Sequence, residues 1–588
     1  MASLGDRVQH VIVLMLENRS FDHMLGFVPG VRDLTGTESN PSAGGDVKVS
    51  DDADFVLPLG PDHTHVGIMS QIANNNQGFV KAYAAVVEKA RNDGKDLPPN
   101  LDRAVMRSFA PGRVPVLGTL AQQFVTFRRW FASVPGETWP NRNYAHAATS
   151  HGQVDIKVQP YTDRTIFELL AKNQRSWRIY HDGPAQAWAF PKLWLAFWRH
   201  RFKDMNRLFA AIDRDQLDHY SFIEPDHGLL PLDKTSNNQH PDNNTVAKQN
   251  GLDFLAGEKL IATIYERLRA NPAVFQKTLF LVTYDEHGGF YDHVSPLPAV
   301  PPDKHVWQKG NARFGFDLLG VRVPAILISP WLDPATIDTP HFDHSSIVAT
   351  LRGLFAPEAA PLNKRDAAAN TFLDLKVRGT PRTDLPPVTP APMPSEPERR
   401  MAIKALGAPA LEAEPVLDGF QQSLVSLTEA VNRRLDAEAN PAVRRSRAAL
   451  PERLPSPASV RRRFRTHEEL AVYMEYVTRR FHRSIDLSAL ELTDAEGKVI
   501  ERPDRATVQR AFRNLGAVAG PRAKVSLRTA DDLVVVADQS GALRRIDLET
   551  GAEESISGAP ARAGAVAPAS APELAAAALA AIGRSDLR

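Results

Sequence analysis

The stretch VIVLMLEN, residues 11–18, places six apolar residues directly before Glu17 and Asn18. A short, continuous apolar run rich in branched side chains is typical of a strand that is buried on both faces of a sheet. In open α/β sheets, ligands bind beyond the carboxyl ends of such strands. Glu17 and Asn18 are therefore candidate site residues, and an ordinary polar loop after a buried strand is the alternative.

Further runs of the same kind follow at residues 176–180, 219–223, 278–284 and 323–329. Helix-like stretches, such as residues 165–172 and 257–270, lie between them. This alternation predicts an α/β fold with a largely parallel sheet and helices on both sides. Four of the five apolar runs end in Asp, Glu or His, whereas the run at 323–329 ends in Pro-Trp. The repeated polar ends favour a site at one edge of the sheet.

The composition limits the classes of function. A chain of 588 residues predicts a large catalytic domain with an additional region. The net charge of +1 provides no field that attracts nucleic acid, and the absence of cysteine excludes disulfides and cysteine-ligated zinc. No apolar run approaches the roughly 18 residues that a membrane span needs, and no leader is visible. The sequence as given predicts a cytoplasmic protein, or one exported as a mature form or by a signal-less route.

Composition also predicts the organisation of the chain. Residues 1–378 form the catalytic domain, and residues 379–398 form a Pro-rich linker. An accessory region at 399–560 has helical patterns followed by a small β-meander, and the Ala- and Pro-rich tail at 561–588 has the composition of a partly disordered segment. The basic clusters at 444–447 and 461–465 predict a solvated surface, with contact to anionic lipid or a partner protein as the alternative.

Two adjacent acids, Asp285 and Glu286, follow the run at 278–284. Carboxylates at the end of a buried strand are costly unless a cation is present, and a divalent metal ion meets that cost. The glycines at 288 and 289 permit a turn that brings both carboxylates to one ion. With Glu17 and Asn18 they form a set of hard oxygen ligands, suited to calcium, manganese, magnesium or iron. An exposed acidic loop is the alternative.

The segment GETWPNRNYAHAATSHG, residues 136–152, predicts a helix with Thr138 as its N-cap and Gly152 at its end. The positive end of a helix favours an alkoxide or a phosphate near Thr138. A plain N-cap threonine is the alternative. Histidines also recur in polar loops, and two or three of them could bind phosphate oxygens or protonate a leaving group while the rest are structural.

The stretches ENRSFDH, TWPNR, the His-Pro of NNQHPDNN and TYDEHGGFYDHV occur in this order along the chain. Together they resemble the bacterial phosphoesterase family of phosphatidylcholine-type phospholipases C and related acid phosphatases, over about residues 8–378. The resemblance implies an alkaline-phosphatase-like fold, a three-layer α/β/α sandwich. It also implies phosphoryl transfer assisted by one divalent metal ion. The region after residue 380 does not match the usual C-terminal domains of the phospholipase branch.

The resemblance assigns roles residue by residue. The metal ligands that it implies are Glu17, Asn18, Thr138, Asp285 and Glu286. The nucleophilic Ser or Thr of the family corresponds to Thr138. The phosphate contacts that it implies are His65 and His227, and the general acid is His240. Arg19 to His23 are interpreted as a turn that holds the ligands in place, with no chemical role.

The function implied is hydrolysis of phosphodiesters, such as phospholipid head groups, through a phosphothreonine intermediate. The substrate would be a phospholipid or another phosphate ester, with peripheral membrane contact as an accompanying expectation. A phosphomonoesterase of the acid-phosphatase type is the alternative within the same chemistry. A non-catalytic effector or binding protein on a phosphoesterase fold is the alternative of another class.

Overall fold

The computed structural model describes residues 4–194, 199–229, 236–241, 252–393, 417, 419–439 and 467–482, together with six short strands between 491 and 555. The chain divides into two compact units: Met1–Phe190 with Lys203–Thr478, and Pro191–Phe202 with Arg479–Arg588. The tail at 561–588 and the basic clusters at 444–447 and 461–465 lie outside the described residues. The domain boundaries expected from composition stay a prediction.

The centre of the first unit is a mixed, mostly parallel sheet with the strand order β13-β4-β12-β9-β1-β8-β6-β7. All five apolar runs form strands in it. The strands are β1 (His10–Leu16), β4 (Val125–Phe127), β6 (Trp177–Tyr180), β7 (Phe202–Lys203), β8 (Tyr220–Ile223), β9 (Thr278–Tyr284), β12 (Ala325–Ile328) and β13 (Ala335–Ile337). Every residue of β9 and all but the first of β1 are buried, as expected for strands covered on both faces.

Strand β12 is antiparallel to both of its neighbours, β9 and β4, whereas β1 is parallel to β8 and β9. The carboxyl end of β12 therefore lies at the opposite edge of the sheet from the ends of β1, β8 and β9. This is the one apolar run that is not followed by Asp, Glu or His. Its direction explains why its end differs from the other four.

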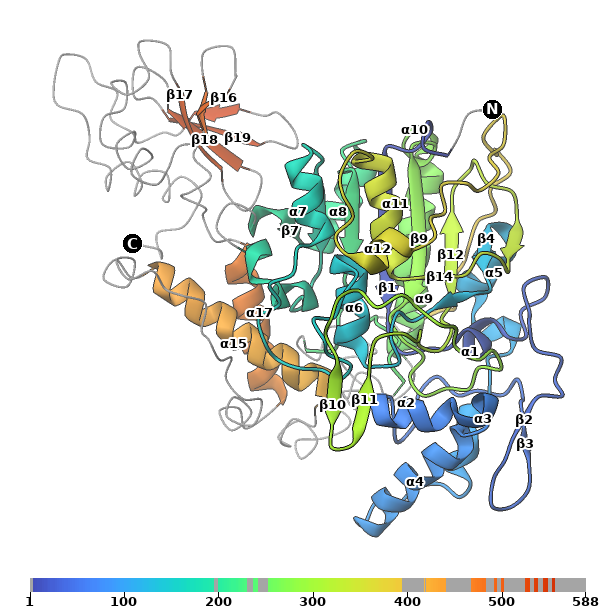
Figure 1. Cartoon of the computed structure of the whole chain (residues 1–588). Helices are drawn as coiled ribbons and strands as arrows, with labels where there is room; N and C mark the ends of the chain where they lie inside the picture. Colours follow the sequence, from blue (N-terminus) through green and yellow to red (C-terminus); the bar gives the residue numbers. More distant parts are fainter. Residues whose placement is uncertain are drawn as a thin grey trace, which may run out of the picture. The chain divides into compact units, whose positions relative to one another are not determined.

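Two groups of helices cover the sheet (Figure 1). In one group α11 (Ser345–Phe355) packs on α6 (Thr138–Ala147) and α7 (Ile166–Lys172). In the other, α9 (Leu252–Ala270) packs on α5 (Pro115–Gln123), α8 (Met205–Asp213) and α10 (Pro272–Phe275). The helices expected at 165–172 and 257–270 are α7 and α9. The fold is the predicted α/β/α sandwich with a largely parallel central sheet.

The remaining elements lie around this sandwich and in the second unit. The other helices are α1 (Phe21–Leu25), α2 (His65–Gln71), α3 (Ala73–Asn76), α4 (Phe79–Asn92), α12 (Lys364–Ala368), α15 (Gly419–Ala439) and α17 (His467–His482). Short strand pairs are β2 (Ser39–Asn40) with β3 (Val47–Lys48), β5 (Trp130–Phe131) with β14 (Phe342–Asp343), and β10 (Trp307–Lys309) with β11 (Ala312–Phe314). None of the helices in the described residues is both long and apolar enough to cross a membrane.

The second unit contains a six-stranded antiparallel sheet in the order β16-β15-β17-β18-β19-β20. Its strands are β15 (Glu491–Thr493), β16 (Val499–Glu501), β17 (Lys524–Arg528), β18 (Leu533–Ala537), β19 (Leu543–Asp547) and β20 (Glu553–Ser555). Strands β18 to β20 pair consecutively, which is the β-meander that alternating runs and turn signals predicted there.

Helix α6 corrects two details of the sequence-based interpretation. Its N-cap is Glu137 rather than Thr138, and Thr138 is the first helical residue. The helix ends at Ala147, where Ala148 adopts the left-handed conformation with φ 54°, and does not continue to Gly152. The N-cap rule was wrong here because the Thr138 hydroxyl is directed at Asn18 and not at its own helix backbone.

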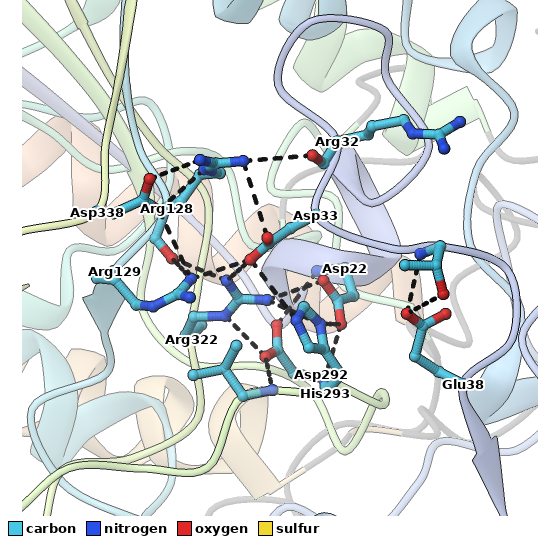
Figure 2. Close-up of polar contacts among 12 residues, drawn as sticks. Asp22, Arg32, Asp33, Glu38, Arg128, Arg129, Asp292, His293, Arg322 and Asp338 are labelled. Carbon is cyan, nitrogen blue, oxygen red and sulfur yellow. Dashed lines mark hydrogen bonds and ion pairs between the residues drawn. The ribbon is translucent and has the colours of Figure 1, made fainter.

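A buried charge network ties α1 to the loops that follow β9 (Figure 2). The fully buried guanidinium of Arg322 lies 2.9 Å from Asp22 Oδ1, 2.7 Å from Asp292 Oδ1 and 2.7 Å from Asp33 Oδ2. The His293 Nδ1 atom lies 2.7 Å from Asp22 Oδ2. This network supports the interpretation of residues 19–23 as a turn that holds the strand end in place.

Replacing Arg322 by leucine is expected to destabilise the fold by about 3–5 kcal/mol, because it leaves buried carboxylates without their cation. Burial already raises the pKa of Asp292 to about 6 against the opposing charge of Arg322. Denaturant unfolding monitored by circular dichroism measures the change. The matched control is Arg267→Leu, which breaks a half-exposed ion pair to Asp213 and is expected to cost at most about 1 kcal/mol. Equal losses in the two variants would contradict a special role for the buried network.

Candidate active site

The ends of β1 and β9 meet at one edge of the sheet. The two strands are parallel neighbours, and Leu16 is paired with Tyr284, so Glu17 and Asn18 lie beside Asp285 and Glu286. The Asn18 backbone N–H donates to Asp285 Oδ1 at 3.0 Å, and its side-chain amide donates to Glu286 Oε1. All four side chains are buried. The structure thus brings together the four strand-end residues that sequence reasoning proposed.

The turn after β9 depends on glycine. Gly288 and Gly289 both have left-handed backbones, with φ of 67° and 76°. A Cβ atom at Gly288 would lie 2.2 Å from the backbone oxygen of Asn18, which no side chain could accommodate. The Gly288 N–H also donates to Glu286 Oε2 at 2.7 Å. Gly288 therefore lets the β9 turn pack directly on the β1 turn and holds the Glu286 carboxylate, while Gly289 lets the same turn approach Pro61 and Asp62.

Thr138 joins this group from the first turn of α6. Its hydroxyl donates to Asn18 Oδ1 at 3.4 Å, and the residue is buried. Asn18 thus contacts Thr138, Asp285 and Glu286 at once, with its own backbone in the left-handed conformation at φ 59°. We refer to the five side chains as the oxygen cluster: Glu17, Asn18, Thr138, Asp285 and Glu286.

Arg142 lies one helical turn after Thr138 and is completely buried. Its guanidinium approaches three carboxylates, at 3.3 Å from Asp285, 3.7 Å from Glu17 and 3.8 Å from Glu224. It also donates to the backbone oxygen of Met15 in β1 at 3.0 Å. Sequence reasoning quoted this arginine only as part of TWPNR and gave it no role. Its i, i+4 spacing from Thr138 on one helix was the available signal.

His227 and Glu224 extend the cluster from the end of β8. The His227 Nδ1 atom lies 2.9 Å from Glu17 Oε1, and its Nε2 atom lies 3.5 Å from Glu224 Oε2. Burial lowers the pKa of His227, but the two carboxylates raise it to about 9. Burial likewise raises the pKa of Glu17, while His227 and Arg142 lower it to about 2. Near neutral pH, Glu17 is therefore ionised and His227 is cationic.

The charges of this region do not balance. Its buried carboxylates are Glu17, Glu224, Asp285 and Glu286. These four carboxylates outnumber the two cations that approach them directly, Arg142 and His227. Burial raises the pKa of Asp285 to about 7 even though Arg142 opposes the shift. One divalent cation among these oxygens would balance the charge, so the residues fit a divalent metal ion of the hard-ligand type.

His240 and His63 lie near each other, with ring centroids 5.9 Å apart. The His240 backbone N–H donates to Asn238 Oδ1 at 2.9 Å, and the charge of its ring helps to lower the pKa of Glu17. Burial raises the pKa of Glu137, the residue before Thr138, to about 7, while the charge of His63 opposes this shift. The sequence DHTH, residues 62–65, carries two histidines, and spacing alone gave His63 no role because it could not choose between them.

His65, the predicted phosphate contact, starts α2. Its Nδ1 atom lies 2.6 Å from the backbone oxygen of Pro135, and its ring packs on Trp307 and Phe314 at centroid distances of 4.6 Å and 4.8 Å. Burial lowers its pKa, so the ring tends to the neutral form. These contacts join the N-terminus of α2 to the loop that leads into α6. A phosphate-binding role for His65 stays a prediction.

A second group of ligand-type side chains exists elsewhere. Within the described part of the chain, Asp22, Asp292 and His293 form the one set of three His or acidic residues with ligand atoms within 4.8 Å of one another. Arg322 already contacts both aspartates and supplies the balancing charge. The oxygen cluster has an unbalanced charge, and an amide and a hydroxyl complete its donors. Its residues therefore fit a divalent metal ion better than those of the Arg322 network do.

Comparison with known proteins agrees with this geometry. The Phosphoesterase family matches residues 8–356. Non-specific phospholipase C1 of Arabidopsis thaliana is 36% identical over 71% of this chain and 79% of its own length. Hemolytic phospholipase C of Pseudomonas aeruginosa is 29% identical over 59% of this chain and 53% of its own length.

A solved alkaline phosphatase superfamily protein of Vibrio parahaemolyticus covers 41% of this chain and 60% of its own, at 13% identity and a TM-score of 0.26. The assignment rests on the family match and the sequence relatives, which cover most of the described sandwich. The chain is a hydrolase that acts on phosphoric ester bonds, and it belongs to the Phosphoesterase family.

Proposed function

We propose that this protein is a phospholipase C that cleaves the glycerol–phosphate ester bond of a phospholipid and releases the phosphorylated head group. The observation that carries the proposal is the meeting of Asn18, Asp285 and Glu286 at adjacent strand ends with Thr138 of α6, among buried carboxylates that outnumber the cations in contact with them. Relatives across more than two thirds of the chain are named non-specific phospholipases C. A peripheral membrane contact belongs to the same proposal, because such a substrate resides in a bilayer.

The oxygen cluster would hold one divalent metal ion, which is calcium, manganese, magnesium or iron by its ligand type. When bound, the ion supplies positive charge that favours the ionised Thr138 hydroxyl and the developing phosphoryl charge. Thr138 acts as the nucleophile on phosphorus, giving a phosphothreonine that water then hydrolyses. Asn18 orients the Thr138 oxygen through the hydrogen bond that it accepts.

The surrounding residues move protons and hold the cluster. His240 is the proposed general acid that protonates the leaving oxygen. Arg142 keeps Glu17 and Asp285 in place through contacts from α6. Both ring nitrogens of His227 face carboxylates, and this geometry favours a role in positioning Glu17 over direct phosphate binding. The direct phosphate contact of His227 stays a prediction.

The test compares three substrates with the purified chain, loaded in turn with each of the four metal ions. The expected result is that phosphatidylcholine and a soluble phosphodiester are hydrolysed at least about tenfold faster, by kcat/KM, than a phosphate monoester. A preference for the monoester would replace the proposal by a phosphatase of the acid-phosphatase type. Full metal occupancy with no turnover on any substrate would favour a non-catalytic binding protein.

A further inference from the structure

Exposed apolar side chains are unevenly distributed over the molecule. Across the part of the chain that the structure describes, six large hydrophobic residues are exposed: Val66, Met69, Val300, Val306, Val472 and Tyr476. Two of them lie on α2, and two lie in or just before the segment that enters the β10–β11 hairpin. Single exposed apolar residues are ordinary, but apolar residues gathered on contacting elements mark an interaction surface.

Helix α2 exposes an apolar face. Val66 and Met69 are 54% and 38% exposed, and their i, i+3 spacing places them on the same side of the helix. The sequence of α2, HVGIMSQ, contains no Asp, Glu, Lys or Arg. Its other side is buried, with Ile68 in the hydrophobic core beneath. The helix therefore exposes an apolar surface to solvent.

The β10–β11 hairpin adds cations and an indole next to α2 (Figure 1). The hairpin is held to α2 by the ring contacts of Trp307 and Phe314 with His65. Its exposed cations are Lys304, Lys309 and Arg313, and residues 304–314 contain no Asp or Glu. Val306 is 42% exposed beside the partly buried Trp307. Exposed apolar side chains, a partly buried tryptophan and surrounding cations match the chemistry of an anionic bilayer surface.

This surface adjoins the oxygen cluster through α2. At the end of the helix, the Gln71 side-chain oxygen lies 2.8 Å from Nε2 of His287, the residue after Glu286. At its start, His65 contacts Pro135, three residues before Thr138. One short helix therefore contacts the exposed hairpin at its first residue and the loops of the cluster at both ends.

We propose that α2 and the β10–β11 hairpin form a rim that docks on an anionic lipid bilayer and delivers a lipid head group to the oxygen cluster. The rim is defined by Val66, Met69, Lys304, Val306, Lys309 and Arg313. This proposal rests on the proposed phospholipase function for its purpose. Binding of the rim to vesicles does not require turnover, so it is measured separately from hydrolysis.

The experiment measures sedimentation of the full chain with vesicles of phosphatidylcholine alone and of phosphatidylcholine with phosphatidylglycerol. Val306→Glu is expected to lower partitioning to both kinds of vesicle at least about fivefold. Lys309→Glu is expected to lower partitioning at least about fivefold only on the anionic vesicles and to weaken its salt dependence. Matched controls are Val472→Glu on α17 and Lys259→Glu on α9, both exposed and both outside the rim.

The controls are expected to bind within about twofold of the unchanged chain, since they make the same chemical changes elsewhere. All four variants should hydrolyse a soluble phosphodiester at an unchanged rate, which shows that they are folded. Rim variants that bind like the unchanged chain, controls that lose binding equally, or an unchanged chain that does not sediment would each overturn the proposal. In the last case, a Val306-dependent dimer in solution would assign the surface to a second copy. If the chain binds vesicles but hydrolyses no ester, the proposed function is overturned, whereas the proposed role of the rim in lipid binding stands.

Discussion

Thr138→Ala is expected to lower kcat for phosphodiester hydrolysis by at least about 1,000-fold, because it removes the proposed nucleophile. The fold should remain, since the change deletes a hydroxyl and a methyl group and costs about 1 kcal/mol or slightly more. The hydroxyl donates to Asn18 and does not cap its helix, so the first turn of α6 keeps its backbone partners. Steady-state kinetics and thermal unfolding on the same preparation measure the two effects.

The matched control is Thr138→Ser, which keeps the oxygen and removes only the methyl group. It should retain a substantial part of the activity, and it should form a covalent phosphoenzyme on acid quenching with a labelled substrate. The alanine variant should form none. Turnover of the alanine variant close to that of the unchanged chain would exclude Thr138 as the nucleophile.

The double variant Asp285→Asn with Glu286→Gln is expected to lose most of its bound metal ion and to reduce hydrolysis about 1,000-fold or more. Two of the four buried carboxylates of this region are replaced by neutral amides, while the shapes of the side chains are kept. Elemental analysis of the purified protein gives the metal content per chain, and the kinetics are measured with the metal ion in excess.

The matched control for this prediction is Asp292→Asn, in the second acidic group. Arg322 already neutralises that group, so this variant should keep its metal ion even though it unfolds at a lower temperature. Unchanged metal content in the double variant would remove Asp285 and Glu286 from the ligand set. Loss of metal only in the Asp292 variant would move the metal site to the Arg322 network.

The positions of the strands in the sequence were predictable, but the order in which they pair in the sheet was not. Each buried strand is a local pattern of apolar residues, and β1 and β9 were both apparent from VIVLML and TLFLVTY. Whether Glu17 lies beside Asp285 depends on a pairing between segments more than 260 residues apart, which no local pattern encodes. The reversed direction of β12 was equally hidden, because an apolar run reads the same in either direction.

Site residues could be predicted where a family motif specified the residue type. They were harder to predict where tertiary packing determines which side chains meet. The N-cap rule failed at Thr138 because a tertiary contact to Asn18 takes the hydroxyl that a cap would use. Arg142 and Glu224 went unassigned because their roles follow from three-dimensional charge balance. A buried arginine becomes informative only when the carboxylates around it are known.

Helix α15 limits how freely the C-terminal region could be exchanged. Its Phe420 ring packs on the His227 ring with centroids 4.6 Å apart, and Gln421 donates to the His227 backbone oxygen at 2.9 Å. The histidine beside Glu17 thus has one wall built by residues that follow the Pro-rich segment. A C-terminal region borrowed from a relative could replace this one only if it brought an equivalent aromatic residue to the same place. The part of the sequence that is easiest to regard as an appendage therefore contributes directly to the surroundings of the candidate site.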